Sequence, residues 1–218
     1  MLEHNGVQIT WLGHDSFKIS HSKTLYIDPY KIKSAGKADI LLISHEHFDH
    51  LSMDDIKKIT GSNTSIVAAK QCADALKNVV AKEVVVVKPG EKVNVQGIAI
   101  EAVAAYNTNK INPDTKKPFH PKEDNKVGFV VTINNVRIYH AGDTDAIQEM
   151  KHIRTDIALL PVSGTYVMTA EEAAEAVKMI KPKIAVPMHY GAIVGSEKDA
   201  EKFKHLVKEC DVKILNKE

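Results

Sequence analysis

Short hydrophobic runs separated by turn residues dominate the first half of the chain. Residues 7–12, 16–20 and 24–28 have the composition of short strands. Residues 39–44 (DILLIS) form a continuous apolar run, which is typical of a central strand covered on both faces. Further strands are predicted at 65–68, 84–87 and 98–103. Helices are predicted near 71–79 and after Ser52, where Asp55 stands three residues on and Gly61 marks the end.

The second half repeats this alternation of strands and helices. Strands are predicted at 127–133 and 136–140, joined by a two-residue turn at Asn134-Asn135, and at 156–161, 183–188 and 212–215. Thr169 with Glu172 forms a capping box for a helix over 170–180, and a last helix starts at Ser196. The pattern predicts one α/β (α+β) domain over residues 1–218, with two sheets packed face to face and helices outside. Residues 107–126 form the one long stretch without regular structure.

Composition narrows the class of protein. The chain has 218 residues, of which 29 are basic and 28 are acidic. Because these charges nearly cancel, the chain has no overall electrostatic field that would attract nucleic acid. It shows no export signal and no apolar run of membrane-spanning length, which predicts a cytoplasmic protein without stable membrane insertion. Two distant cysteines do not make a disulfide framework. The expected partner is a small-molecule substrate, and homo-oligomerisation is left open.

The clearest chemical signal follows the apolar run directly. His45-Glu46-His47-Phe48-Asp49-His50 places three histidines and an aspartate within six residues at the carboxyl end of a predicted strand. Imidazole and carboxylate ligands suit Zn²⁺, Mn²⁺ or Fe²⁺. On a loop, His45 and His47 can face one ion while Asp49 and His50 turn toward another. The alternative, a surface histidine run, does not fit its position after a buried strand.

Two later strand ends offer matching ligand types. Asp143 follows the strand 136–140 and would suit the bridge between two cations, and His189 follows the strand 183–188. Taken alone, Asp143 would equally fit a turn or helix cap, and His189 would fit a satisfied buried histidine. Together with the first cluster they predict a site for two divalent metal ions, zinc or manganese rather than iron.

The ordered motifs resemble the metallo-β-lactamase superfamily. They are His45-x-His47-x-Asp49-His50, Gly142-Asp143-Thr144 and Pro187-x-His189. The opening Thr10-Trp11-Leu12-Gly13-His14 and the segment 159–164 are most similar to a branch of stand-alone metal-dependent hydrolases. That branch is related to ascorbate-6-phosphate lactonase and to the phospholipase D that cleaves N-acylphosphatidylethanolamine. The resemblance implies a four-layer αββα sandwich with metals at the edge between the sheets.

The resemblance also implies how the ligands divide. One metal would take His45, His47 and Asp143, and the other would take Asp49, His50, His189 and again Asp143. The family usually supplies a further histidine where this chain has Asn107, a departure from the pattern. His120, in the long loop, is the expected replacement. Without it the first metal would keep an open position and bind more weakly.

Three further features are weighed against simpler roles. His14 would contact substrate or a leaving group, or else would be a solvent-facing turn residue. Asp28 would accept the free ring N–H of a ligand histidine, or else would cap a turn before Pro29. The loop 107–126 carries five lysines against three acidic residues, so it is either a lid that attracts an anionic substrate or a solvated mobile loop.

The predicted chemistry is hydrolysis by a metal-bound hydroxide, with Asp49 orienting the nucleophile and receiving a proton. The bond would be a phosphodiester or a lactone or ester in a small anionic substrate. The alternative is an iron-dependent, dioxygenase-like redox enzyme on the same fold, which the ligand pattern and the chain length disfavour. A non-catalytic metal-binding protein is a third class, disfavoured because the ligand set looks nearly full.

Overall fold

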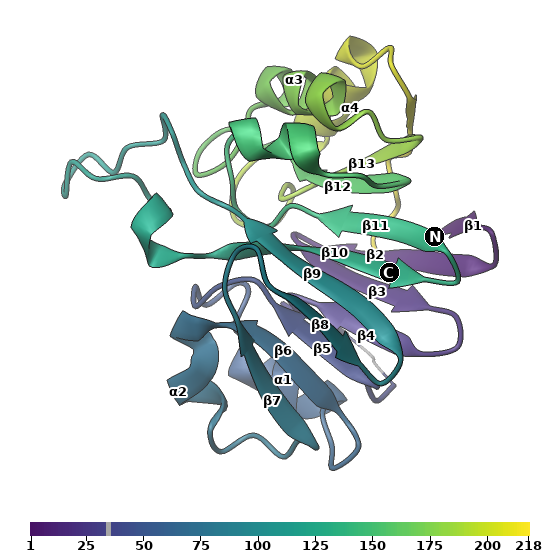
Figure 1. The fold of residues 1–218 in the computed structure, drawn as a ribbon. Coiled ribbons are helices and arrows are strands. Elements are labelled where there is room, and N and C mark those ends of the chain that lie inside the picture. The colour runs from purple at the N-terminus through teal and green to yellow at the C-terminus, as the bar shows by residue number, and fades with distance from the viewer. Residues whose placement is uncertain (34–35) are drawn as a thin grey trace.

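The computed structural model describes residues 1–33 and 36–218 and stacks two mixed sheets face to face (Figure 1). Within each sheet the strands lie side by side in chain order. The first sheet holds β1 (Leu2–His4), β2 (Val7–Gly13), β3 (Ser16–Ser20), β4 (Thr24–Ile27), β5 (Ile40–Ile43), β6 (Ser65–Ala69) and β7 (Glu83–Val87). The second holds β8 (Lys92–Val95), β9 (Ile98–Ala104), β10 (Val127–Ile133), β11 (Val136–His140), β12 (Ile157–Pro161), β13 (Ile184–Met188) and β14 (Asp211–Val212).

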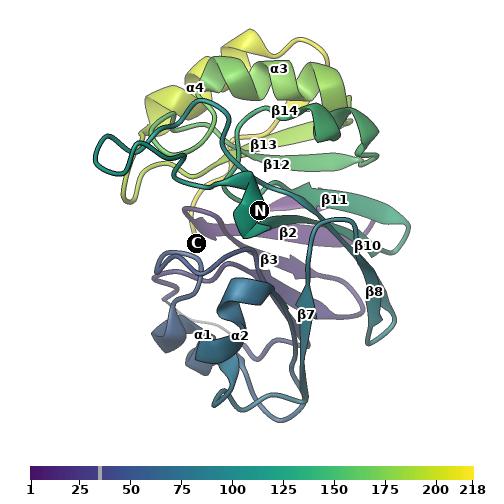
Figure 2. The same cartoon turned by 60° about the vertical axis from the view of Figure 1, so that its left-hand side comes forward.

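Helices cover the outer faces of both sheets, as Figures 1 and 2 show. On the first sheet lie α1 (Met53–Ile59), the 3₁₀ turn η1 (Lys70–Cys72) and α2 (Ala73–Leu76). On the second lie η3 (Gln148–His152), α3 (Ala170–Ile180) and α4 (Glu197–Leu206). The predicted αββα sandwich is therefore confirmed. In the part of the chain that the structure describes, no helix has the length and apolar character needed to cross a membrane.

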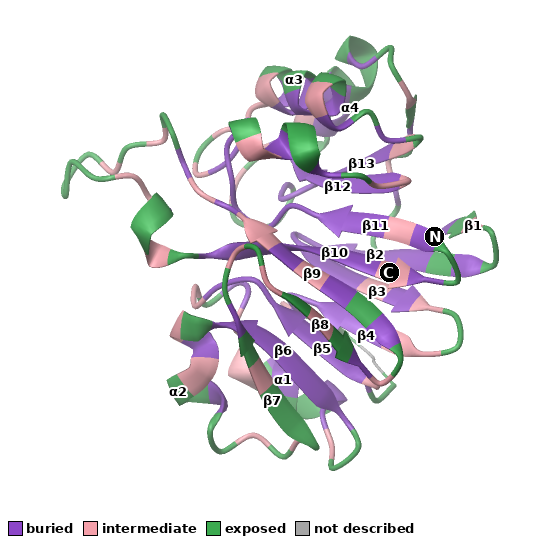
Figure 3. Ribbon diagram, viewed as in Figure 1, coloured by how far each residue is buried: buried purple, intermediate pink, exposed green. Residues whose placement is uncertain are grey.

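Both sheets follow the same plan of pairing. Antiparallel strands come first, and parallel strands follow from β4 to β7 and from β11 to β14. The central parallel strands β5 and β12 are buried at every position (Figure 3), because the other sheet covers one face and helices cover the other. Loops that follow the carboxyl ends of β5, β11 and β13 meet at one edge of the sandwich, where polar residues gather.

Most predicted elements appear with nearly the predicted bounds. The turn at Asn134-Asn135 has φ of 49° and 60°, the left-handed pair that a tight hairpin turn requires. The capping box at Thr169 with Glu172 forms, and the last helix starts after Ser196 as predicted, with Asp199 Oδ2 accepting from the Ser196 backbone N–H at 2.7 Å. Ser52 stands at the N-cap of α1, but its hydroxyl donates to Asp55 and makes no capping hydrogen bond to the helix backbone. Strands β1 and β8 were not predicted, and β14 is shorter than predicted.

The long segment 107–126 is more ordered than predicted. It contains the 3₁₀ turn η2 (Lys122–Asp124) and a bridge between Ile111 and Pro118 that closes a small hairpin. The hairpin extends away from the sheets in Figure 1. Lys110 anchors its base, with Nζ 2.9 Å from Glu172 Oε1 and 3.4 Å from Asp145 Oδ1. The description of this segment as structureless is therefore corrected.

Candidate metal centre

The predicted ligands come from both sheets and meet at their common edge. His45, His47, Asp49 and His50 occupy the turn after β5, in which the His50 N–H donates to the His47 carbonyl oxygen at 2.9 Å. Asp143 follows β11. Gly142 precedes it with φ of 62°, and a Cβ there would lie 2.8 Å from the Val127 carbonyl oxygen. The turn that presents Asp143 therefore requires glycine at position 142.

One group of donors contains His45, His47, His120 and Asp143. One ligand atom from each lies within 4.8 Å of every other, which is close enough to share one ion. His120 Nε2 lies 3.3 Å from His47 Nδ1 and 3.2 Å from Asp143 Oδ2. The structure thus brings His120 into the place where the family pattern is interrupted.

Asn107 holds His120 rather than joining the donor group itself. The Asn107 side-chain oxygen lies 2.9 Å from both the backbone nitrogen and Nδ1 of His120. Because an amide oxygen only accepts, Nδ1 of His120 carries the hydrogen and Nε2 is left free to coordinate. Asn107 therefore fixes both the position and the tautomer of His120.

A second group of donors lies on the other side of Asp143. It contains His14, Asp49, His50 and His189, and an overlapping group contains Asp15, His50, Asp143 and His189. His14, which stands in the turn between β2 and β3, has Nε2 2.9 Å from Asp49 Oδ2. His14 therefore faces the site, not solvent, and contacts Asp49 directly.

The Asp143 carboxylate lies between the two groups. Its Oδ2 is 3.2 Å from His120 Nε2, 3.5 Å from His189 Nε2 and 3.9 Å from His45 Nε2. Its Oδ1 is 3.3 Å from His50 Nε2. One carboxylate thus faces four imidazole nitrogens, as a ligand shared between two cations would.

The donor atoms are suited to metal because many of them are buried without any other partner. Among the described residues, His45 Nε2, His50 Nε2, Asp143 Oδ1 and both carboxylate oxygens of Asp15 are buried and make no hydrogen bond. A buried polar atom without a partner costs on the order of 1–3 kcal/mol. Divalent cations would satisfy these atoms together, so the residues present fit a metal centre.

Burial and neighbouring charges shift the pKa values of the histidines at the site. Burial lowers the pKa of His47, and the nearby Lys126 ammonium lowers it further, to about 4. His47 is therefore neutral, the form in which histidine binds metal. Burial opposes the charge on His189, but the Asp143 and Asp15 carboxylates outweigh it and raise the pKa of His189 to about 9.

Outer contacts fix the orientation of the histidine rings. Asp28 Oδ2 lies 2.9 Å from His50 Nδ1, and its Oδ1 accepts from the Ser44 backbone N–H at 2.8 Å. Ser163 Oγ lies 2.8 Å from His189 Nδ1. Asp28 thus makes the contact proposed for it from sequence, since it leaves Nε2 of His50 facing the donor group.

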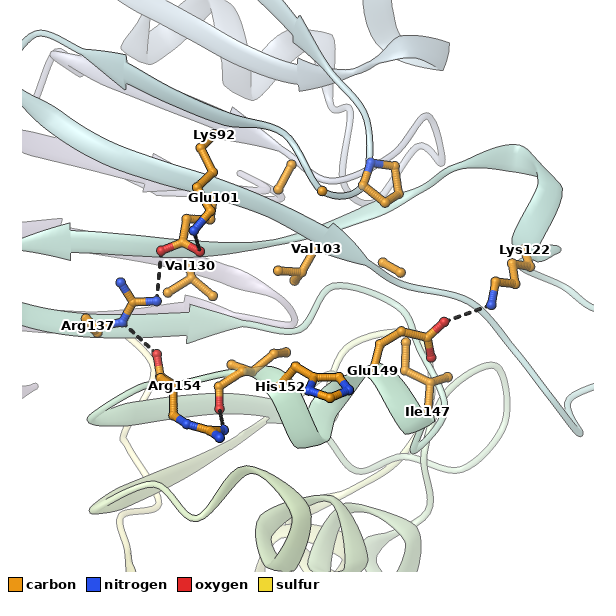
Figure 4. Close-up of a pocket in the computed structure, with 15 residues that line it drawn as sticks. Lys92, Glu101, Val103, Lys122, Val130, Arg137, Ile147, Glu149, His152 and Arg154 are labelled. Atoms are coloured by element: carbon orange, nitrogen blue, oxygen red, sulfur yellow. Dashed lines mark hydrogen bonds and ion pairs between the residues drawn. The ribbon is translucent and has the colours of Figure 1, made fainter.

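A cavity of about 300 Å³ opens onto the first donor group. It is lined by His47, Phe48, Asp49, Phe119, His120, Asp143, Tyr166 and Ile193. A larger cavity of about 720 Å³ lies elsewhere, against β9, β10 and η3 (Figure 4). Its charged groups pair with one another, as Arg137 with Glu101 and Lys122 with Glu149, and the candidate metal ligands lie outside it.

Sequence reasoning missed Asp15 altogether. It stands next to His14 in the turn between β2 and β3 and is fully buried beside His50. In sequence it looks like an ordinary turn aspartate, and the only available signal was its place after the candidate His14. His140 is buried, and both of its ring nitrogens are hydrogen-bonded to backbone atoms, so it is not a ligand.

The fold and the histidine-rich edge together define a metallo-β-lactamase fold. The family model of the β-lactamase superfamily domain matches residues 8–189, and the chain belongs to that superfamily. A protein of Thermoplasma acidophilum named UPF0173 metal-dependent hydrolase is 35% identical over 213 residues, covering 92% of this chain and 90% of that one. A relative of the same name from Archaeoglobus fulgidus is 31% identical over 226 residues, covering 96% and 95%.

Solved structures agree with this assignment. A crystal structure from Parabacteroides distasonis is 34% identical, has a TM-score of 0.82 and covers 97% of this chain and 94% of that chain. Igni18, a metallo hydrolase from Ignicoccus hospitalis, is 23% identical with a TM-score of 0.77 over 96% and 95%, which shows a shared fold. The membership predicted from the sequence motifs is confirmed, while the closer resemblance to a lactonase and a phospholipase D stays a prediction.

Proposed function

We propose that the protein is a hydrolase dependent on two divalent cations, which cleaves a phosphodiester or a lactone or ester bond in a small anionic substrate. The observation that carries this proposal is the position of Asp143 between two groups of buried imidazoles. The names of the relatives support hydrolysis over the iron-dependent redox alternative.

The two donor groups would hold the cations between them. His45, His47 and His120 would bind one, Asp49, His50 and His189 the other, and Asp143 would contact both. Cations bound in this way lower the pKa of water and polarise the bond to be cleaved. The chain's own task is then to aim every ligand nitrogen inward. Asn107 does so for His120, Asp28 for His50 and Ser163 for His189.

Asp49 and His14 would handle the proton. Asp49 lines the cavity, and its Oδ2 lies 2.9 Å from His14 Nε2. A carboxylate in this position can accept a proton from the attacking water, and His14 holds it in a fixed orientation. Burial raises the pKa of Asp49, but the hydrogen bond with His14 and the charge of His50 together outweigh it, so the net shift of this pKa is downward. Asp49 is therefore ionised and ready to accept.

The cavity supports a small substrate. Its volume of about 300 Å³ lies at the lower end of ligand pockets. Phe48, Phe119, Tyr166 and Ile193 supply an apolar wall opposite the carboxylates. An apolar or sugar-like group would pack on this wall while the anionic group turns toward the cations.

The test combines metal content with hydrolysis. The protein is stripped of metal, reloaded with Mn²⁺ or Zn²⁺, and assayed on an aryl phosphodiester and a panel of lactones, beside Asp143→Ala. Two metals per chain in the native protein, with turnover that depends on metal and is lost in the variant, would support the proposal and rank the two bond types. A single bound iron with oxygen consumption would overturn it in favour of the redox alternative.

A further inference from the structure

The cavity at the metal centre is bounded by large apolar side chains that are open to solvent. Phe48 is 67% exposed, and the other four phenylalanines, all of which the structure describes, are buried or half-buried. Ile193, on the loop after β13, is 39% exposed. Exposed apolar side chains that gather at a concave site mark a surface that a ligand covers. Because these side chains lie beside the candidate metal ligands, the substrate is the ligand expected to cover them.

Aromatic rings make up most of this apolar wall. Phe119 and Tyr166 pack edge to face, with ring centroids 4.8 Å apart and ring planes at 80°. Phe48 contacts Tyr30 in the same manner, at 5.9 Å and 76°. Rings paired in this way hold a fixed orientation and offer an edge or a face to a further ring, a contact that contributes beyond the area it buries. A flat aromatic group therefore gains more from this wall than an aliphatic group of the same size.

The wall is tied to the first donor group by hydrogen bonds. Asn107 Nδ2 donates to the Tyr166 carbonyl oxygen at 2.9 Å, while Asn107 Oδ1 lies 2.9 Å from His120 Nδ1. Phe119 directly precedes His120, and the Phe119 N–H donates to the Lys110 carbonyl oxygen at 3.1 Å. Asn107 thus fixes both a ligand histidine and the loop that carries Tyr166. A ring packed on the wall would therefore lie at a set position relative to the cations.

Among the residues that the structure describes, no lysine or arginine lines this cavity. Three lysines of the segment 107–126 are engaged with glutamates instead: Lys110 Nζ lies 2.9 Å from Glu172 Oε1, Lys122 Nζ 2.7 Å from Glu149 Oε1 and Lys126 Nζ 2.8 Å from Glu46 Oε1. Lys116 and Lys117 are exposed on the hairpin. Both arginines of the chain line the larger cavity of Figure 4. The positive charge offered to a substrate would thus come from the bound cations.

We propose that the substrate carries an uncharged aromatic ring next to the bond that is cleaved, and that Phe119 and Tyr166 select this ring. Any negative charge of the substrate then lies in the scissile group itself, where the cations neutralise it. This inference rests on the proposed two-cation function and names the substrate class of that site. The lysine-rich segment 107–126 serves to position Phe119 and not to attract an anion. The cavity volume of about 300 Å³ suits a compact benzyl or aryl ester.

The test uses phosphonates, which place a charged group on the cations and are not hydrolysed, so that recognition of the ring is measured apart from turnover. Benzylphosphonate, cyclohexylmethylphosphonate, methylphosphonate and para-carboxybenzylphosphonate are titrated by calorimetry into protein reloaded with Zn²⁺. The methyl groups of Ile193 are followed by NMR, because a bound aromatic ring shifts their resonances by its ring current. Acetate and methyl phosphate esters of the corresponding alcohols are then compared for kcat/KM.

Two matched pairs of variants separate the contribution of the ring from other causes. Tyr166→Leu keeps apolar volume and removes the ring, whereas Tyr166→Ala removes both. Ile193→Ala shortens a side chain that lines the cavity, and Ile111→Ala shortens one of similar exposure, 47%, on the hairpin outside it. These side chains lie outside the donor groups. Metal per chain is measured for every variant by elemental analysis.

We expect benzylphosphonate to bind about 10- to 100-fold more tightly than methylphosphonate, as the burial of one ring-sized apolar group requires. It should bind about 2- to 10-fold more tightly than the cyclohexyl compound. The para-carboxybenzyl compound should bind no more tightly than benzylphosphonate, because its carboxylate finds no basic partner on the wall. The esters should follow the same order in kcat/KM.

Among the variants, Tyr166→Ala should lose about tenfold in affinity for benzylphosphonate and little for methylphosphonate. Tyr166→Leu should lose the preference for the benzyl over the cyclohexyl compound and keep the preference for either over methyl. Ile193→Ala should weaken benzylphosphonate binding, and Ile111→Ala should not. All four variants should keep both metals.

Three results would overturn the inference while the two bound metals leave the proposed function in place. The first is equal affinity for the benzyl and methyl compounds, or no binding of either. The second is tighter binding of the para-carboxybenzyl compound, which would show that a basic group serves the substrate. The third is an equal loss of benzylphosphonate affinity in Ile111→Ala and Ile193→Ala, which would place the ring outside the cavity. Fewer than two metals per chain in the native protein would instead refute the proposed function, and the inference with it.

Discussion

Replacing Asp28 with asparagine tests whether a residue that touches no cation controls the metal centre. The Asp28 carboxylate is fully buried and accepts on both oxygens. Oδ1 receives the Ser44 N–H at 2.8 Å, while Oδ2 receives the Ser44 hydroxyl and lies 2.9 Å from His50 Nδ1. An asparagine has one accepting oxygen in place of two, so its amide NH₂ must face either the Ser44 N–H or His50 Nδ1.

The less costly arrangement places the NH₂ group against His50, because the Ser44 backbone N–H cannot rotate away. His50 must then accept at Nδ1 and carry its hydrogen on Nε2. That nitrogen lies 3.3 Å from Asp143 Oδ1 and is the one directed at the candidate metal. A protonated Nε2 cannot coordinate, so the substitution removes a ligand without touching it.

The expected loss of metal affinity can be estimated from other sites in which a side chain orients a ligand histidine. Changes to groups that orient a ligand histidine lower metal affinity about 10- to 100-fold, which is about 1.4–2.8 kcal/mol. Asp55→Asn is the matched control. Asp55 is likewise a buried carboxylate that accepts several hydrogen bonds, from the Lys31 N–H and Ser52 Oγ at 2.7 Å each, but it belongs to no donor group. Both variants should lose fold stability, and only Asp28→Asn should lose metal.

The assay is competition with a coloured chelator, together with thermal melts with and without Mn²⁺. The reasoning would be refuted if Asp28→Asn kept native metal affinity, or if Asp55→Asn lost as much of it. In either case the orientation of His50 would not depend on the Asp28 contact.

Four further outcomes follow from single features. Gly128→Ala places a Cβ 2.6 Å from the Ala141 carbonyl oxygen, so melting curves should show a loss of about 1–3 kcal/mol in stability. Thr169→Ala removes the hydroxyl that accepts from the Glu172 N–H at 3.2 Å in the capping box of α3, and it should lower the melting temperature by about 2–4 °C, for a cap of about 1 kcal/mol. Burial raises the pKa of Cys210 to about 11 and that of Cys72 further, so both thiols should react slowly with a disulfide reagent near about pH 8 until the protein is unfolded. Stripping the metals should lower the melting temperature, since a bound ion at about 100 times its dissociation constant contributes about 2.7 kcal/mol.

The sequence predicted those parts of the site that lie in contiguous motifs. His45, His47, Asp49 and His50 could be found because four candidate ligand residues follow one buried strand within six positions. The central strands could be found because burial on both faces produces unbroken apolar runs. Strands β1 and β8 escaped prediction because β1 has three residues and β8 is mostly exposed, so neither shows a clear hydrophobic pattern.

Asp15 and the role of Asn107 escaped prediction for a different reason. Each depends on a partner far along the chain: Asp15 is held by His140, 125 residues away, and Asn107 orients a histidine 13 residues away across a loop. A turn aspartate and a loop asparagine have the same appearance whether they face solvent or a buried site. Asp15 faces the buried site because the second sheet packs on the turn between β2 and β3, and the local sequence does not show this packing.

The location of the site between the sheets explains why so many unpaired polar atoms can be buried there. The first sheet contributes His14, Asp15 and the turn after β5, and the second contributes Asp143 and His189. Each of the donor groups takes members from both sheets, so closing the sandwich completes the centre. Packing of the extensive apolar core that the two sheets share provides the free energy that holds these groups together without metal. The cations would then act mainly to satisfy buried charge, and their removal would weaken the edge of the sandwich while its core stays folded.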